Sequence, residues 1–158
     1  MLEKVLTILL WFCALGCALL GGLYFAFSAF IMKALGNVGH AGINAMNSIN
    51  AVILKSAFMP VFFGTTLACG ALVILGLLRL DDPRSPWMIA GGAVYIAGMF
   101  FVTLMFNVPL NNALAAIGPE SRTGNAIWKD YLRRWTRWNH VRTVSCMLAA
   151  AAFIHAIR

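Results

Sequence analysis

The chain has 158 residues, of which 61% are hydrophobic and 11% are charged, and its mean hydropathy is +0.83. Soluble domains contain about 45–50% apolar and about 25% charged residues, so this composition excludes an ordinary soluble domain. The net charge of +7 would suit nucleic acid, but we assign it to basic side chains that flank membrane spans and meet lipid headgroups. We therefore predict membrane lipid as a partner and no nucleic acid.

Four apolar stretches explain the hydropathy and predict an all-α, integral membrane four-helix bundle. A helix needs about 20 apolar residues to cross a hydrocarbon core about 30 Å thick. We place the spans at about residues 5–32, 52–78, 87–106 and 126–157, within a single domain that covers residues 1–158. The last helix begins before its apolar part, so an amphipathic aromatic and basic segment extends it.

The first span has no cleavage pattern of a secretory signal, so we expect it to be retained. One of its faces carries small and polar residues, which allow helices to approach closely and leave a homo-oligomer open. These residues are Cys13, Cys17, Gly21, Tyr24 and Ser28. No two cysteines form a CxxC pair, so we predict neither a disulfide framework nor a zinc site.

The connections between spans carry most of the helix-breaking and amide residues. The short turn at residues 81–86 predicts a tight hairpin between the second and third spans. Because proline cannot continue a regular helix, we expect Pro109 to end the third span and Asn107 to satisfy the free carbonyls there. The first connection, residues 33–51, is rich in amides and includes Asn44, Asn47 and Asn50.

The segment from Asn125 onward is predicted to be one helix with two different faces. Residues at spacings of three and four form an aromatic face that ends in an amide and a guanidinium. This face contains Trp128, Tyr131, Trp135, Asn139 and Arg142, while Lys129, Arg133, Arg137 and His140 form a basic face that suits headgroups. We expect Asp130 to pair on the surface with Arg133 and Arg134.

An even number of spans places both termini on one side of the membrane. The terminal side then carries four basic residues, Lys4, Arg79, Arg84 and Arg158. The opposite side carries eight, which are Lys33, Lys55, Arg122, Lys129, Arg133, Arg134, Arg137 and Arg142. The excess predicts that the large-loop face lies in the cytoplasm, and we expect the inner membrane of a bacterium.

Polar and aromatic residues converge at the loop-side ends of all four spans, which predicts a pocket at that interface. The set is Tyr24, Ser28, Asn47, Asn50, Asn107, Asn111, Trp135, Asn139 and Arg142. Arg142 lies deeper than the basic face, where a guanidinium needs acceptors. Such a pocket suits a flat, apolar ligand with a carbonyl or phenolic oxygen, although a purely structural polar network would use the same residues.

The acidic and histidine residues are too few and too scattered for several other kinds of site. Only Glu3, Asp81, Asp82, Glu120 and Asp130 are acidic. We therefore predict no metal site and no paired-carboxylate chemistry. The three histidines form no HExxH pattern, and the glycine pattern of a dinucleotide fold is missing.

Several of these residues together resemble the anthrone oxygenase-like family of membrane proteins. The resemblance rests on Asn107-Val108-Pro109-Leu110-Asn111 followed by Trp128, Tyr131, Trp135, Trp138-Asn139 and Arg142, and on Gly21, Tyr24, Phe25, Met46, Ile49-Asn50 and Phe58. It covers nearly the whole chain and implies a four-helix membrane fold. It also implies an oxidoreductase of the monooxygenase kind that oxidises anthrone-like polyketides with molecular oxygen as co-substrate and no cofactor.

The resemblance suggests roles for particular residues. A deprotonated anthrone is an extended oxyanion that reacts with oxygen, and a cation with amide donors would stabilise it. We expect Arg142 to stabilise the oxyanion, Asn139 and Asn107 to orient it, and Trp135 to stack on the ring. We expect Trp128, Tyr131, Tyr24, Ser28, Asn50 and Asn111 to complete the substrate site. His140, Tyr24 and Asp130 are the candidates for a base.

Two other functions remain open at this point. The chain could be a non-catalytic binding or scaffold protein that uses the basic face of its last helix against anionic lipid. It could also be a redox subunit that binds a quinone or lipid in the same aromatic pocket. The sequence leaves open whether the chain is an enzyme at all.

Overall fold

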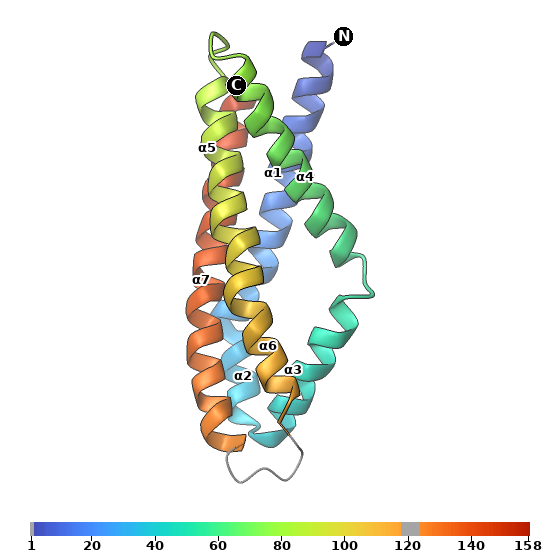
Figure 1. Cartoon of the computed structure of the whole chain (residues 1–158), viewed down its shortest axis with the longest axis vertical. Helices are drawn as coiled ribbons and strands as arrows, with labels where there is room; N and C mark the ends of the chain where they lie inside the picture. Colours follow the sequence, from blue (N-terminus) through green and yellow to red (C-terminus); the bar gives the residue numbers. More distant parts are fainter. Residues whose placement is uncertain (1, 118–123) are drawn as a thin grey trace.

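The computed structural model describes residues 2–117 and 124–158, and this part of the chain is helical without strands. Its elements are α1 (Leu2–Ala26), η1 (Phe27–Ile31), α2 (Met32–Asn37), α3 (His40–Ile53), α4 (Phe58–Leu78), α5 (Ser85–Tyr95), η2 (Ile96–Phe101), η3 (Thr103–Asn107), α6 (Val108–Ala115) and α7 (Gly124–Ile157). The three η elements are π-helices. Several elements follow one another without a break, so they form longer rods (Figure 1).

Four of these rods are long and apolar enough to cross a membrane. They are Glu3–Asn37, Phe58–Leu78, Ser85–Ala115 and Ala126–Ile157. The predicted all-α membrane bundle is therefore confirmed, and α7 contains the amphipathic extension in a single helix of 34 residues. Both termini lie at one end of the bundle, and α2, α3 and α6 lie toward the other (Figure 1). Arg122 and Glu120 lie outside the described residues.

The second rod starts later than the sequence predicted, because residues 40–53 form the separate helix α3 instead of a loop. The reversal before α3 uses Gly39, whose φ of +57° favours glycine. Gly42 then packs so closely that a Cβ there would overlap the carbonyl oxygen of Leu35. These two glycines allow α3 to fold back on α2 beside the rest of the bundle.

A short corner at residues 54–57 joins α3 to α4, and Ser56 holds it. The Ser56 hydroxyl donates to the carbonyl of Ile53 at 2.8 Å and accepts from the backbone N–H of Phe58 at 3.2 Å. One side chain thus satisfies the last turn of α3 and the first turn of α4. From this corner α4 leans back toward the terminal end of the bundle (Figure 1).

The expectation that Pro109 ends the third span is wrong, since the rod continues to Ala115. Pro109 comes directly after the π-helix Thr103–Asn107 and occupies the first turn of α6. At that position the missing N–H removes no hydrogen bond within the new helix. The change from π to α geometry therefore lets the rod pass through the proline.

The turn between α4 and α5 is short, as predicted, and ion pairs attach it to the start of α1. Glu3 contacts Arg84 at 2.6 Å and Arg79 at 3.4 Å, and Arg84 also pairs with Asp82 at 2.7 Å. The hydrogen-bonded Arg84 guanidinium lowers the pKa of the Asp82 carboxyl to about 2. The same contacts raise the pKa of Arg84. This cluster fastens three helix ends together at the terminal end.

The interior contains two packed clusters at different heights. The first lies where α1, α4, α5 and α7 meet, and it includes Leu10, Leu72, Tyr95 and Phe153. All four cysteines are buried in this cluster as free thiols. The second lies toward the loop-side end and contains Phe27, Met32, Ile43, Met46, Leu114, Trp128, Tyr131 and Trp135. The candidate site lies beside this second cluster.

Candidate functional site

A cavity of about 440 Å³ lies between α1, η1, α3, α4, η3, α6 and α7. This volume falls within the range of about 300–1,000 Å³ that is usual for small-molecule sites. Six of the residues predicted for the pocket from the sequence line it: Tyr24, Asn47, Asn50, Asn111, Trp135 and Arg142. The structure thus brings together predicted residues from α1, α3, α6 and α7.

Arg142 is the cation of the cavity, and it is only 5% exposed. One of its terminal nitrogens donates to Oδ1 of Asn139 at 2.6 Å, and the other to the hydroxyl of Thr103 at 3.4 Å. Its Nε is buried without a hydrogen-bond partner in the described part of the chain. The guanidinium therefore has one N–H group that the described residues leave unsatisfied.

Two aromatic rings hold the guanidinium in place. The carbon at its centre lies 4.3 Å from the ring centroid of Tyr24 and 5.0 Å from that of Trp135. Each contact is a cation–π interaction, which gains strength where water is excluded. Because two rings contact the guanidinium, the position of its charge is restricted by the fold itself.

Asn139 fastens α7 to α1 behind the cavity and is fully buried. Its Nδ2 donates to the backbone carbonyl of Tyr24 at 2.6 Å and to the Ser28 hydroxyl at 2.7 Å. These two bonds determine that Oδ1 faces Arg142. Asn139 and Ser28 are not among the residues that line the cavity, so they position Arg142 instead of contacting a ligand.

The charge of Arg142 has only neutral partners in the described residues. Glu3, Asp81 and Asp82 lie at the terminal end, and Asp130 is bound by Arg133 at 2.7 Å and Arg134 at 3.4 Å, which confirms the predicted surface pairs. A buried cation without a counter-charge is costly unless a ligand or solvent supplies the negative charge. The cavity is therefore electrostatically suited to an anion or to a strongly polarised oxygen.

The aromatic face of α7 forms a stack beside the cavity. Trp128 lies against Tyr131, with centroids 5.5 Å apart, and Tyr131 against Trp135 at 6.3 Å. Trp128 and Tyr131 are buried and do not line the cavity, so the stack supports Trp135 from behind. Phe27 completes this wall, 5.6 Å from Trp135.

Asn111 connects this stack to the cavity. Its Oδ1 accepts from the Tyr131 hydroxyl and from Nε1 of Trp135, both at 2.9 Å. Both bonds use the oxygen, so the amide nitrogen is the group that this side chain can offer to a ligand. Asn107 is buried one turn earlier and donates to the Trp135 carbonyl at 3.3 Å, outside the cavity lining.

The opposite wall contains two amides that the sequence predicted for the pocket and two aromatic residues that it did not. Asn47 joins Asn50 on α3, and one polar atom of each is buried without a partner among the described residues. Their spacing of three residues places both on one face of α3. Phe58 and Phe62 of α4 add apolar surface that hydropathy alone does not distinguish from lipid-facing residues.

The three candidate bases lie in different places. Tyr24 lines the cavity, where its hydroxyl donates to the sulfur of Met99 at 3.6 Å. His140 is exposed on the basic face of α7, and Asp130 is held by its two arginines. Within residues 2–117 and 124–158, no group of three His, Cys, Asp or Glu residues could hold a metal ion.

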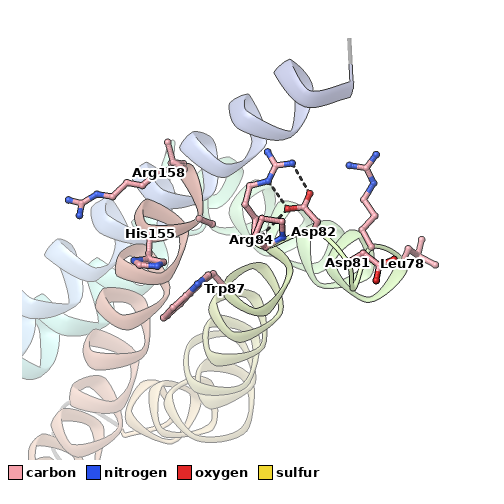
Figure 2. Close-up of a pocket in the computed structure, with 11 residues that line it drawn as sticks. Leu78, Asp81, Asp82, Arg84, Trp87, His155 and Arg158 are labelled. Carbon is pink, nitrogen blue, oxygen red and sulfur yellow. Dashed lines mark hydrogen bonds and ion pairs between the residues drawn. The ribbon is translucent and has the colours of Figure 1, made fainter.

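A second cavity, of about 950 Å³, lies at the terminal end of the bundle (Figure 2). Arg84 points toward Asp82 there, and Trp87 lies beside His155 of α7 with ring centroids 4.2 Å apart. None of the residues predicted for the substrate site lines this cavity. Because Arg79 and Arg84 are already paired with acidic residues, we interpret this end as a structural fastening.

The family comparison covers most of the site. The family model described as "Anthrone oxygenase" matches residues 54–152, which is more than half of the chain. The matched part contains Asn111, Trp135, Asn139 and Arg142, whereas Tyr24 and the amides of α3 precede it. No curated protein and no solved structure matched the chain. The resemblance noted in the sequence is confirmed, and the chain belongs to the anthrone oxygenase family.

Proposed function

We propose that this chain oxidises a flat, lipid-soluble anthrone-like or quinol-like substrate with molecular oxygen in the cavity beside Arg142. The observation that carries the proposal is a 95%-buried guanidinium, fixed by two rings and an amide, whose described partners are all neutral. Such a group stabilises negative charge that develops on a substrate oxygen. The family membership supplies the class of reaction.

The reaction balances without a further reductant. An anthrone loses a proton from its methylene carbon, and the charge spreads to the carbonyl oxygen as an extended anion. Molecular oxygen then forms a bond to that carbon and takes up electrons from the anion. The resulting peroxide anion takes back one proton to become a hydroperoxide, which loses water, so anthrone and O2 give anthraquinone and H2O.

The cavity residues have distinct parts in this scheme. Arg142 stabilises the anion through its charge and its available Nε donor, which lowers the pKa of the carbon acid. Trp135 and Phe27 provide the aromatic wall for the ring system, and the amide nitrogen of Asn111 donates to a second substrate oxygen. Asn139 and Asn107 are positioning residues that hold α7 and Trp135.

The positive charge of Arg142 also explains how the methylene proton of the substrate can be removed. No carboxylate or imidazole among the described residues lines the cavity. We propose that stabilisation by Arg142 makes the substrate acidic enough to lose its proton to water or hydroxide. Tyr24 lies against Arg142 and contributes its ring, not a base.

Oxygen uptake by the purified protein in lipid vesicles, with uncatalysed autoxidation subtracted, tests the proposal. With a simple anthrone, we expect one O2 consumed and one quinone formed per substrate. Arg142→Gln should lower kcat by about a hundredfold or more, whereas Arg137→Ala, on the exposed face of the same helix, should have no effect. Arg142→Lys keeps the charge and should retain part of the activity. A wild-type rate equal to background would reject the proposal.

We also propose that the chain lies in the inner membrane of a bacterium with the cavity end toward the cytoplasm. The support is the excess of basic residues at that end, including exposed Lys33, Arg133 and Arg137. Alkaline phosphatase fused after Arg158 should then be active, because it would lie in the periplasm. An inactive but stable fusion would reverse the orientation.

A further inference from the structure

The cavity has an apolar rim and a polar floor. Four large apolar side chains that line it are also exposed: Leu54 at 64%, Phe63 at 48%, Leu104 at 47% and Val108 at 38%. Arg142, in contrast, is buried at the inner wall. A ligand that moves from the rim to Arg142 therefore passes from apolar to polar surroundings.

The rim lies on the side of the bundle, within the predicted spans. Phe63 belongs to the span Phe58–Leu78, and Leu104 and Val108 belong to the span Ser85–Ala115. At a rise of 1.5 Å per residue, Val108 lies about 10 Å before the end of its span. In a bilayer, Phe63, Leu104 and Val108 would therefore face acyl chains, and Leu54 in the corner would lie at the edge of that layer.

The course of α4 explains why the bundle is open at this place. The corner at residues 54–57 lies apart from α6, and from it α4 leans back toward the terminal end of the bundle while α3 runs toward the other end (Figure 1). Leu54 and Phe63 come from the corner and α4, and Leu104 and Val108 from η3 and α6. The two sides of the rim thus belong to rods that separate at this height.

We propose that the opening framed by Leu54, Phe63, Leu104 and Val108 is a lateral entrance through which a flat aromatic substrate passes from the bilayer into the cavity. The substrate class is an uncharged polycyclic ketone or phenol that dissolves in lipid and exposes one oxygen to Arg142. This proposal rests on the proposed function for its occupant. The charge of Arg142 determines the orientation of the substrate, because the end that carries the oxygen must enter first to reach the guanidinium.

The test uses a probe that binds without turnover, so it does not depend on the reaction. Anthraquinone dissolved in lipid vesicles should quench the tryptophan fluorescence of the protein, since Trp135 lines the cavity. Stopped-flow mixing of probe-loaded vesicles with protein-containing nanodiscs then gives an association rate. The variant Ala51→Phe/Val108→Phe adds bulk at two exposed positions of the cavity lining.

The matched control is Ala93→Phe/Val144→Phe, which adds the same bulk at exposed positions outside the cavity. We expect Ala51→Phe/Val108→Phe to slow association by about tenfold and the control to match the wild type. Equal rates in both variants would overturn the lateral entrance, as would a lack of binding to the wild type. If binding follows the prediction but oxygen uptake stays at background, only the proposed reaction fails.

Discussion

The amide oxygen of Asn139 lies 2.6 Å from a terminal nitrogen of Arg142, and both residues belong to α7. The amide nitrogen of the same Asn139 holds the Tyr24 carbonyl and the Ser28 hydroxyl of the neighbouring rod. One neutral side chain therefore fixes the charge of the cavity and joins two helices. An aspartate of the same size would neutralise the charge that the site needs.

We expect Asn139→Asp to lower oxygen uptake to background, because the new carboxylate would pair with Arg142 and neutralise its charge. The carboxylate cannot donate to the Tyr24 carbonyl, so thermal stability should fall as well, and the ion pair should offset part of this loss. Asn139→Ala should lower both, because Tyr24 and Ser28 lose a donor and each lost buried bond costs about 1–3 kcal/mol. Melting curves and uptake rates measured in the same detergent test this. An active Asn139→Asp protein would show that Arg142 does not stabilise an anion.

Asn111→Ala should mainly weaken binding. The change leaves the Tyr131 hydroxyl and the Trp135 indole without their common acceptor, which costs about 1–3 kcal/mol of stability. Because Trp135 loses its orientation, we expect KM to rise more than kcat falls. Asn44→Ala is the control, since Asn44 is exposed on α3 and does not line the cavity. Equal kinetics in the two variants would argue against a role of Asn111 in the site.

The pH dependence of turnover should follow the substrate. No carboxylate or imidazole in the described residues lines the cavity, so kcat should rise with pH and level off near the pKa of the bound carbon acid. Two anthrones that differ in acidity should give curves displaced by that difference. Curves that coincide for both substrates would instead identify a titrating group of the protein as the base.

The terminal fastening should respond to acid. Because Arg84 lowers the pKa of Asp82 from 3.8 to about 2, the ion pair stabilises the fold above the normal pKa of the carboxyl. This contribution is lost as the pH falls through about 2, when the native carboxyl becomes protonated. We expect Asp82→Asn to be less stable than the wild type at neutral pH. The difference should shrink below pH 4, and a constant difference would contradict this account.

Gly42→Ala should be strongly destabilising, because its Cβ would overlap the Leu35 carbonyl and push α3 away from α2. Gly22→Ala has open space around the new atom and should be neutral or stabilising by up to about 1 kcal/mol, since alanine favours helix. Thermal unfolding of the two variants makes the comparison. Similar melting temperatures would mean that α3 does not depend on this close contact.

The sequence predicts the four spans well because length and hydropathy alone determine whether a helix can cross a bilayer. It fails at Pro109, because the π-helix before the proline is a feature of the packed bundle. It also fails at residues 40–53, which are less apolar than a span and become a helix by folding back at Gly39. Both errors occur where tertiary contacts overrule local preference.

For the site, helical spacing was sufficient to place Trp135 and Arg142 on one face, and topology brought Tyr24, Asn50 and Asn111 to the same end. The sequence could not distinguish residues that line the cavity from those behind it. Trp128 and Tyr131 share the face of Trp135 but are covered by the residues around them. Whether a residue lines the cavity or lies behind it depends on the distance between the rods, and the spacing of residues along one helix does not predict that distance.

The corner held by Ser56 has a consequence for how this architecture can diversify. Arg142 and the residues that hold it belong to α1, η1, η3 and α7, whereas α3, the corner and α4 form much of the opposite wall and one side of the rim. Changes at the corner would widen or narrow the opening and leave the guanidinium in place. If the proposed reaction takes place in the cavity, the size of its ligand and the stabilisation of its anion would therefore be set by different parts of the fold.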